Sequence, residues 1–195
     1  MLRTMADPAR RRATYQDVLD APPHVVAEVI FGTLHTMPRP RVRHARASSR
    51  LGSRLGGPFD EGLGGPGGWV ILDEPELHLG ADPDILVPDL AGWTRERMPR
   101  VPADEAFLTL APDWVCEVLS PSTQAIDRAD KMEVYLREEV THVWHVDPEG
   151  HTLEVFRHDD RSRRYLAAAV WRGAATVRAE PFDAIELDLG ALWAT

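Results

Sequence analysis

The sequence predicts an α+β fold with an α/β-like core, in which a mixed sheet is flanked by helices. Three observations favour this class. Residues 114–119, WVCEVL, are apolar except for one acid, which is typical of a strand buried on both faces. Apolar residues recur at helical spacing in residues 41–56. Several strand-like segments follow one another in residues 142–180.

The 195 residues suit one domain, which we expect over residues 14–195 after a flexible, arginine-rich segment at residues 1–13. Thr14 is a suitable cap for a short helix that follows it. The segment HVVAEVIFGTLHTM then predicts two strands around a turn near Gly32.

The helix predicted in residues 41–56 carries arginines on its outer faces. Gly56 and Gly57 are expected to end it, because glycine commonly terminates helices. Residues 56–68 are rich in glycine and predict a loop inside the domain.

The second part of the chain predicts strands interrupted by one helix. A long, proline-punctuated connection is expected over residues 94–112, and the helix over residues 124–138. The strands are expected as a hairpin over residues 69–79, then over residues 84–93, 114–119, 142–147, 152–158, 164–171 and 175–180, with a helical turn at the end of the chain.

The net charge of −9 argues by itself against a nucleic-acid partner. The charge is uneven, however: residues 1–54 contain ten arginines and four acids, while the remainder contains 12 bases and 27 acids. The arginines of residues 39–54 either contact phosphates or form an ordinary solvated helix face. The candidate nucleic-acid contacts in this segment are Arg43, His44, Arg46 and Arg50.

The single cysteine, Cys116, excludes an intramolecular disulfide framework and a cysteine-based zinc site. Its apolar surroundings predict a core residue, and Trp93, Trp114, Trp144 and Trp171 are expected in the core or at an interface. No apolar run approaches the roughly 18 residues of a membrane span, and the N-terminus lacks the apolar segment of a signal peptide. We therefore expect a cytoplasmic protein without a membrane partner.

Two acids lie in apolar surroundings and are candidate metal ligands. Glu117 lies within WVCEVL, and Asp89 follows Pro88 in ILVPDLA. An ionised carboxylate in such a run is costly without a cation or hydrogen-bond donors. Glu117 either points outward from an edge strand or pairs with an arginine, or it faces a metal ion. On adjacent central strands, the two acids would share a hard cation such as Mg²⁺.

Lys131 is the one lysine among 22 basic residues. Arginine does not replace lysine where a compact charge must orient a water molecule or stabilise a crowded phosphate. The alternative is that Asp127 and Lys131 form an ordinary i,i+4 pair on a helix surface.

These residues resemble the Uma-two family of restriction endonucleases, within the PD-(D/E)XK nuclease superfamily. The resemblance rests on Pro88-Asp89, on the segment EVLSPST from Glu117, on Asp127, Lys131 and Tyr135, and on VWHVDP from Val143. Glu28 followed by Gly32, and His44 at the start of a helix, also fit the family's layout.

The resemblance implies a restriction-endonuclease-like core with Asp89 and Glu117 as metal ligands and Glu28 as a further acid of the site. The superfamily's lysine is expected two residues after the second acid, where this chain has Leu119. The resemblance therefore implies that Lys131 reaches back into the site from the following helix. Asp127 and Tyr135 are implied to be supporting residues.

The predicted function is hydrolysis of phosphodiester bonds in DNA by an endonuclease that depends on Mg²⁺ or Mn²⁺. A homodimer is expected by analogy with nucleases that cut both strands. The alternative is a non-catalytic module of the same fold that binds nucleic acid or protein, which the missing lysine at position 119 and the acidic bulk favour. An unrelated small-molecule hydrolase or a structural domain is the third hypothesis.

Overall fold

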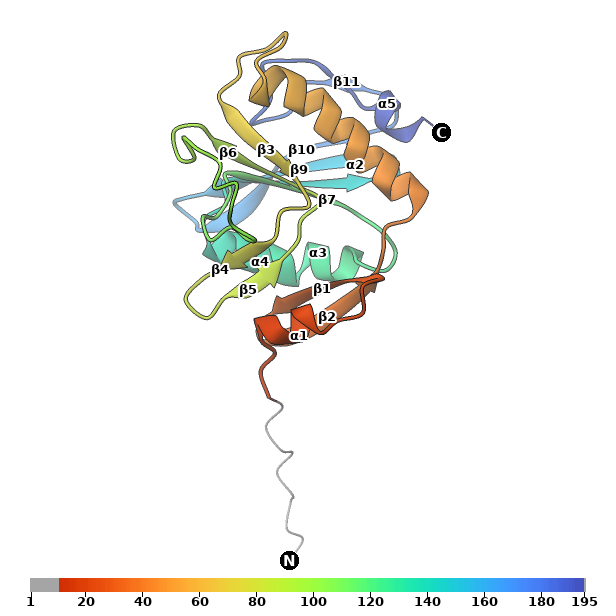
Figure 1. Cartoon of the computed structure of the whole chain (residues 1–195). Coiled ribbons are helices and arrows are strands. Elements are labelled where there is room, and N and C mark those ends of the chain that lie inside the picture. The colour runs from red at the N-terminus through yellow and green to blue at the C-terminus, as the bar shows by residue number, and fades with distance from the viewer. Residues whose placement is uncertain (1–10, 195) are drawn as a thin grey trace, which may run out of the picture.

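A six-stranded mixed sheet is the largest element of the fold, which a computed structural model describes for residues 11–194 (Figure 1). β7 and β8 pair in parallel, and the other neighbouring strands are antiparallel. The spatial order is β10 (Arg164–Arg172), β9 (Thr152–Asp159), β8 (His142–Asp147), β7 (Trp114–Val118), β6 (Leu90–Thr94) and β3 (Trp69–Asp73). This arrangement confirms the predicted mixed sheet flanked by helices.

A four-stranded sheet lies below the large sheet in the view of Figure 1. Its order is β2 (Thr33–Pro38), β1 (Val25–Ile30), β5 (Asp84–Leu86) and β4 (Leu77–Leu79). A two-stranded sheet, β11 (Thr176–Val177) with β12 (Leu187–Asp188), lies near the C-terminus. The helices are α1 (Tyr15–Leu19), α2 (Val42–Leu55), α3 (Gln124–Arg128), α4 (Asp130–Arg137) and α5 (Gly190–Trp193), with a π-helical turn η1 (Gly56–Asp60) after α2.

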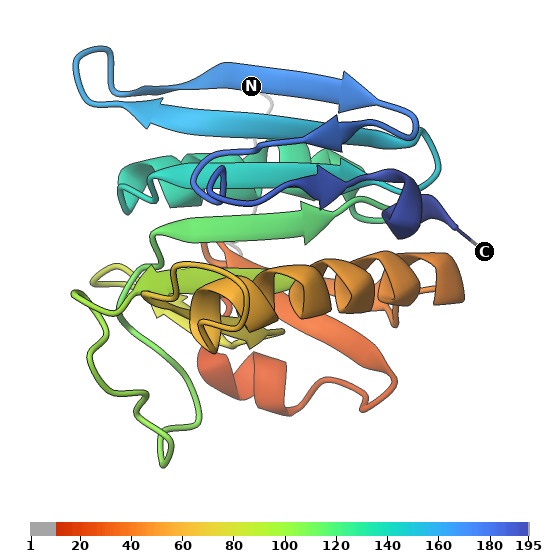
Figure 2. The same cartoon turned by 90° about the horizontal axis from the view of Figure 1, so that it is seen from above.

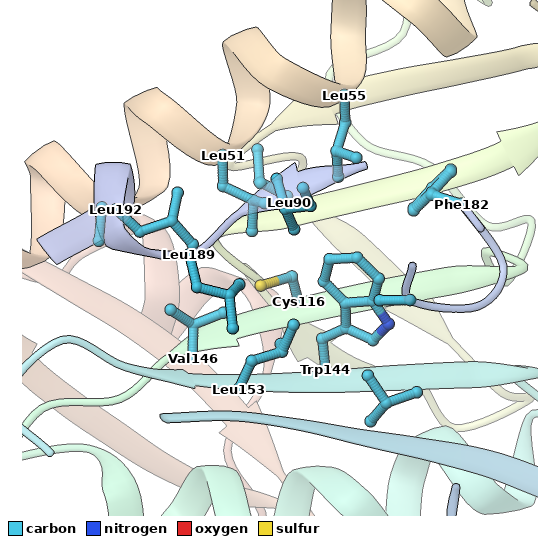
Figure 3. Close-up of a cluster of buried hydrophobic side chains, with 14 of the residues drawn as sticks. Leu51, Leu55, Leu90, Cys116, Trp144, Val146, Leu153, Phe182, Leu189 and Leu192 are labelled. Carbon is cyan, nitrogen blue, oxygen red and sulfur yellow. The ribbon is translucent and has the colours of Figure 1, made fainter. Parts of the chain in front are cut away.

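The large sheet has a hydrophobic core on each face. On one face, α2 and α5 cover a cluster that includes Leu51, Cys116 and Trp144 (Figures 2 and 3). On the other face, Val115 and Val134 belong to a second cluster against α4 and the small sheet. Alternate side chains of β7 therefore enter different cores, as expected for a strand buried on both faces.

The first hairpin, the helix α2 and the buried strand β7 agree with the sequence predictions. Cys116 is a buried core residue, and Trp93, Trp114 and Trp144 are fully buried. The first ten residues of the predicted flexible segment lie outside the described residues. Among the described residues, no helix is long and apolar enough to cross a membrane.

The predicted hairpin over residues 69–79 is wrong, because its two strands belong to different sheets. β3 pairs with β6, and β4 pairs with β5. Glu74 has a left-handed backbone (φ 45°), and Pro75 follows it. The chain therefore turns out of the large sheet after β3 rather than folding back on it.

The strand predicted over residues 84–93 is also split between the two sheets, as β5 and β6. Pro88 lies in the break, and proline has no N–H to donate to a sheet ladder. The apolar pattern continues through the break because both flanking strands are buried.

Three further boundaries differ from the predictions. The helix expected over residues 124–138 consists of α3 and α4, which are separated at Ala129 by a non-helical backbone (φ −121°, ψ −81°). Gly56 keeps a right-handed helical backbone, so α2 continues into η1, where Phe59 is buried in the core. The strand expected over residues 175–180 is limited to the two residues of β11, which pair with β12.

Asp84 links the small sheet to α4, which predicts a large effect on stability. Its Oδ1 accepts a hydrogen bond from the N–H of Phe31 (2.6 Å), and its Oδ2 accepts one from Arg137 (2.8 Å). Because Asp84 is buried, we expect Asp84→Ala to lower the free energy of unfolding by about 2–3 kcal/mol. Denaturant unfolding measures this change. Asp82→Ala removes an exposed ion pair with Arg12 and should cost about 0.5 kcal/mol or less; equal losses in the two variants would contradict the prediction.

Candidate active site

The candidate site lies where the chain crosses from the small sheet to the large sheet. The N–H of Val87 lies between the end of β5 and Pro88, outside the paired strands. It donates instead to Oε1 of Glu28 on β1, at 2.8 Å. The break also places Asp89 directly before β6. One local irregularity therefore positions two of the predicted acids.

Asp89 lies beside the strand that carries Glu117, because β6 and β7 are neighbours. Their register pairs Leu90 with Cys116, so the next position places Asp89 opposite Glu117. Oδ2 of Asp89 accepts a hydrogen bond from the N–H of Val118 at 2.7 Å. Glu117 thus lies on a central strand, and Asp89 lies opposite it, one residue before the neighbouring strand.

Lys131 on α4 is surrounded by three carboxylates. Its Nζ lies 2.9 Å from Oε1 of Glu28, 3.3 Å from Oδ1 of Asp127 and 3.4 Å from Oε1 of Glu117. The Lys131 side chain is 4% exposed. The lysine reaches back from the following helix, and the interpretation of Asp127 and Lys131 as a surface pair is wrong because both residues are buried.

Tyr135 fixes the carboxylate of Glu117. It lies one helical turn after Lys131, and its hydroxyl donates to Oε1 of Glu117 at 2.5 Å. Residues four apart lie on the same helix face, so α4 presents both side chains to β7. The interpretation of Glu117 as an outward-pointing residue of an edge strand is wrong, because β7 lies inside the sheet and Glu117 is buried.

The crowding of charges shifts the pKa values of the cluster. Burial raises the pKa of Glu117 well above its usual range, Lys131 opposes this shift, and the nearby carboxylates add to it. Burial also raises the pKa of Glu28 and of Asp127. Burial alone would lower the pKa of Lys131, but Glu117, Glu28 and Asp127 raise it well above its usual value. The ammonium therefore stays protonated, while the acids have a strong affinity for positive charge.

A pocket of about 430 Å³ opens onto this cluster. Its acidic part contains Glu28, Asp89, Glu117 and Asp127, together with Lys131. The remaining lining residues come from two connecting segments and neighbouring positions: Val26, Met37, Pro38, Arg39, Pro40, Arg41, His44, Glu74, Val87, Ser120, Pro121, Ser122 and Thr123. A ligand that enters the pocket reaches the carboxylates and the ammonium together.

His44 lines the pocket next to Asp89, and its Nε2 lies 3.3 Å from Oδ1 of that acid. Burial opposes the protonation of His44, but Asp89 raises its pKa overall. His44 thus supplies a polar group to the site. The structure places it among the candidate residues.

The other predicted nucleic-acid contacts do not line this pocket. Arg46 donates to the carbonyl of Ala194 at 2.8 Å, and Arg50 donates to the carbonyls of Ala191 and Ala194. Both arginines therefore hold the C-terminal helix against α2. Arg43 lies 3.7 Å from Glu149 in an exposed ion pair.

Arg39 and Arg41 line the pocket and were not singled out by the sequence analysis, although they belong to the arginine-rich segment. The signal that distinguishes them is the alternation Pro38-Arg39-Pro40-Arg41, which restrains the backbone just before α2. Ser120, on the loop after β7, also lines the pocket.

The donor set of the pocket fits a hard divalent cation. Glu28, Asp89, Glu117 and Asp127 supply carboxylate oxygens, which Mg²⁺ and Mn²⁺ prefer, and one ammonium does not balance their charge. Oε2 of Glu28 is buried without a hydrogen-bond partner. In the part of the chain that the structure describes, no three metal-ligating side chains already surround a common position. Glu28, Glu117 and Asp127 instead converge on Lys131.

Comparison with known proteins relates the chain to one family and to a solved structure. Residues 12–190 match the model of the Uma2 family, described as "Putative restriction endonuclease". The fold is similar to the crystal structure of a protein titled "a putative nuclease belonging to DUF820" from Anabaena variabilis ATCC 29413, with a TM-score of 0.70 and 23% sequence identity. That match covers 92% of this chain and 97% of the other. No curated protein matches the sequence.

Proposed function

The chain belongs to the Uma2 family, and from this premise we propose that it is a metal-dependent endonuclease that hydrolyses phosphodiester bonds in DNA. One observation carries the proposal: the ammonium of Lys131 is buried against Glu28, Glu117 and Asp127 at a pocket that also contains Asp89. Opposite charges combined in one pocket suit a phosphodiester and its attacking water molecule.

Asp89 and Glu117, with the backbone carbonyl of Val118, would hold Mg²⁺ or Mn²⁺. A bound ion of this kind polarises a phosphate oxygen and lowers the pKa of a water molecule. Asp89 is held by the N–H of Val118, and Glu117 by the hydroxyl of Tyr135. Both carboxylates are therefore positioned before a substrate arrives.

Lys131 positions the attacking water molecule and offsets negative charge on the scissile phosphate. Its ammonium is restrained by Glu28 and Asp127, so it is already ordered before a substrate binds. Glu28 is restrained in turn by the N–H of Val87. Cleavage of both strands of a duplex would use two such sites, so we propose that the protein acts as a homodimer.

Relaxation of supercoiled plasmid DNA tests the proposed function. We expect the wild-type protein to nick the plasmid in Mg²⁺ or Mn²⁺ and to leave it intact in EDTA. Lys131→Ala and Asp89→Asn should reduce the rate by at least about 100-fold, since positioned proton-transfer and charge-stabilising groups contribute that much. Equal nicking by all three proteins, or nicking in EDTA, would overturn the proposal. Binding of the plasmid without nicking would favour the non-catalytic module instead.

A further inference from the structure

The pocket has a cationic rim that the proposed chemistry does not use. Arg39 and Arg41 line the same pocket as Glu117 and Lys131, and both arginines are exposed. Within the described residues, neither side chain forms a hydrogen bond or an ion pair. By contrast, Arg46 and Arg50 of α2 are bound to backbone carbonyls. Two guanidinium groups without an ion-pair partner among the described residues therefore border the pocket whose acidic part contains Glu117.

The backbone presents these two arginines rigidly. Arg39 lies between Pro38 and Pro40, and a residue that precedes proline is restricted to extended conformations. Arg41 is also extended (φ −72°, ψ 159°). Both side chains line the same pocket. The segment therefore holds both guanidinium groups toward one ligand at a low cost in conformational entropy.

The N-terminus of α2 lies at the same rim and adds positive potential. Arg41 is the N-cap of this 14-residue helix, no side chain caps it, and its first turn contains no acid. The first N–H groups of a helix favour an anion at this position. His44, in the first turn, lines the pocket, is 9% exposed and has an Nδ1 atom without a hydrogen-bond partner. The rim thus combines two arginines that have no side-chain partner among the described residues, the N-terminus of α2, and a buried histidine whose Nδ1 lacks a hydrogen-bond partner.

We propose that Arg39, Arg41 and the N-terminus of α2 bind a backbone phosphate of the nucleic acid, next to the phosphodiester that enters the acidic part of the pocket. This inference rests on the proposed function. The carboxylates in the acidic part of the pocket repel a polyanion, so a neighbouring cationic site is needed to hold the nucleic-acid strand. Guanidinium groups suit this task because they bind phosphate oxygens in bidentate fashion. The contact thus falls on the Pro-Arg-Pro-Arg segment and not on Arg46 or Arg50.

Fluorescence anisotropy of a fluorescein-labelled DNA duplex, measured over a range of salt concentrations in EDTA, tests this inference. The double variant Arg39→Ala/Arg41→Ala should bind about tenfold more weakly, and the magnitude of the slope of log K against log salt should fall by about 1, because the one phosphate contact that is lost contributes about 0.9. Arg161→Ala/Arg164→Ala removes two exposed arginines far along the sequence that have no side-chain partner among the described residues. This matched control should change affinity by less than about twofold.

The lysine double variant, Arg39→Lys/Arg41→Lys, should keep the salt slope but lose part of the affinity, because lysine preserves the charge without the bidentate geometry. Equal affinity and slope in the alanine variant and its matched control would overturn the inference. Plasmid nicking by the wild type keeps this result separate from the proposed function. If the wild type nicks DNA but the arginines have no effect, only the inference fails. If the arginines determine the slope but no nicking occurs, only the proposed cleavage fails.

Discussion

Replacement of Lys131 by methionine should lower the free energy of unfolding by about 3–5 kcal/mol at pH 8, as expected when one partner is removed from a buried ion cluster. Methionine fills most of the space of the lysine stem, so the loss is electrostatic rather than a cavity effect. Glu28, Glu117 and Asp127 would then lie buried without their common cation. Urea unfolding in EDTA measures the change. Arg100→Met, at an exposed position, is the matched control and should cost about 0.5 kcal/mol or less.

The loss of unfolding free energy in Lys131→Met should increase with pH. Burial raises the pKa of Glu28, Glu117 and Asp127, and Lys131 opposes each shift. Without the ammonium, these pKa values rise further above the unfolded values of about 4. The folded variant then binds more protons than the unfolded chain, so its stability is greatest at low pH and falls as the pH rises above about 4. The defect should be smaller at pH 5 than at pH 8.

A second substitution identifies the source of the loss. Glu28 is the nearest carboxylate to Lys131, so Glu28→Gln in the Lys131→Met background should restore part of the stability. Two results would show that the buried charges do not cause the loss of stability. One is a loss in Lys131→Met that does not depend on pH, and the other is a double variant that is no more stable than Lys131→Met.

Glu117→Gln should abolish metal binding, with a loss of affinity of at least about 100-fold, because it replaces an anionic ligand by a neutral amide of the same shape. Calorimetric titration with Mn²⁺ measures the affinity. Tyr135→Phe keeps the carboxylate but removes the hydrogen bond that orients it, so we expect a loss of about 10- to 100-fold. Glu133→Gln, at an exposed position of α4, should leave the affinity unchanged. Equal affinities in Glu117→Gln and Glu133→Gln would exclude Glu117 as a ligand.

Asp89, Glu117 and Lys131 could be found from the sequence because each differs in character from its neighbours, whereas Glu28 and the role of Asp127 in the site were implied by the family resemblance. Glu117 is an acid within an apolar strand, and Lys131 is the one lysine in an arginine-rich chain. A buried charge is costly unless it is compensated, so an acid in such a segment indicates a nearby partner. The structure supplies that partner, since Lys131 lies 3.4 Å from Glu117.

The pattern of apolar residues could not predict that the chain passes from the small sheet to the large sheet at Val87–Asp89. The segments on both sides of Pro88 are buried, so the apolar pattern does not show that the chain changes sheets there. The separation of α3 from α4 at Ala129 could not be predicted either. It is a change in backbone geometry within a segment whose composition is typical of one continuous helix. Such breaks are decided by tertiary contacts, among them the hydrogen bond from Val87 to Glu28.

Charge counting identified the arginine-rich segment but not which arginines are available. Arg46 and Arg50 contact the C-terminal helix, which is about 140 residues away along the chain, and no local pattern reveals this pairing. Arg39 and Arg41 differ from them only through the neighbouring prolines and their place at the pocket. The net charge likewise conceals a pocket in which both signs of charge meet.

Single-turnover cleavage of an end-labelled DNA duplex in saturating Mg²⁺ tests the central claim most directly, namely that the carboxylates around Lys131 form a metal-dependent cleavage site. We predict that wild-type protein cuts the strand, that Tyr135→Phe cuts about 10- to 100-fold more slowly, and that Glu117→Gln leaves it intact. Glu133→Gln should match the wild type. Cleavage by Glu117→Gln at the wild-type rate, or no cleavage by any of the four folded proteins, would contradict the account.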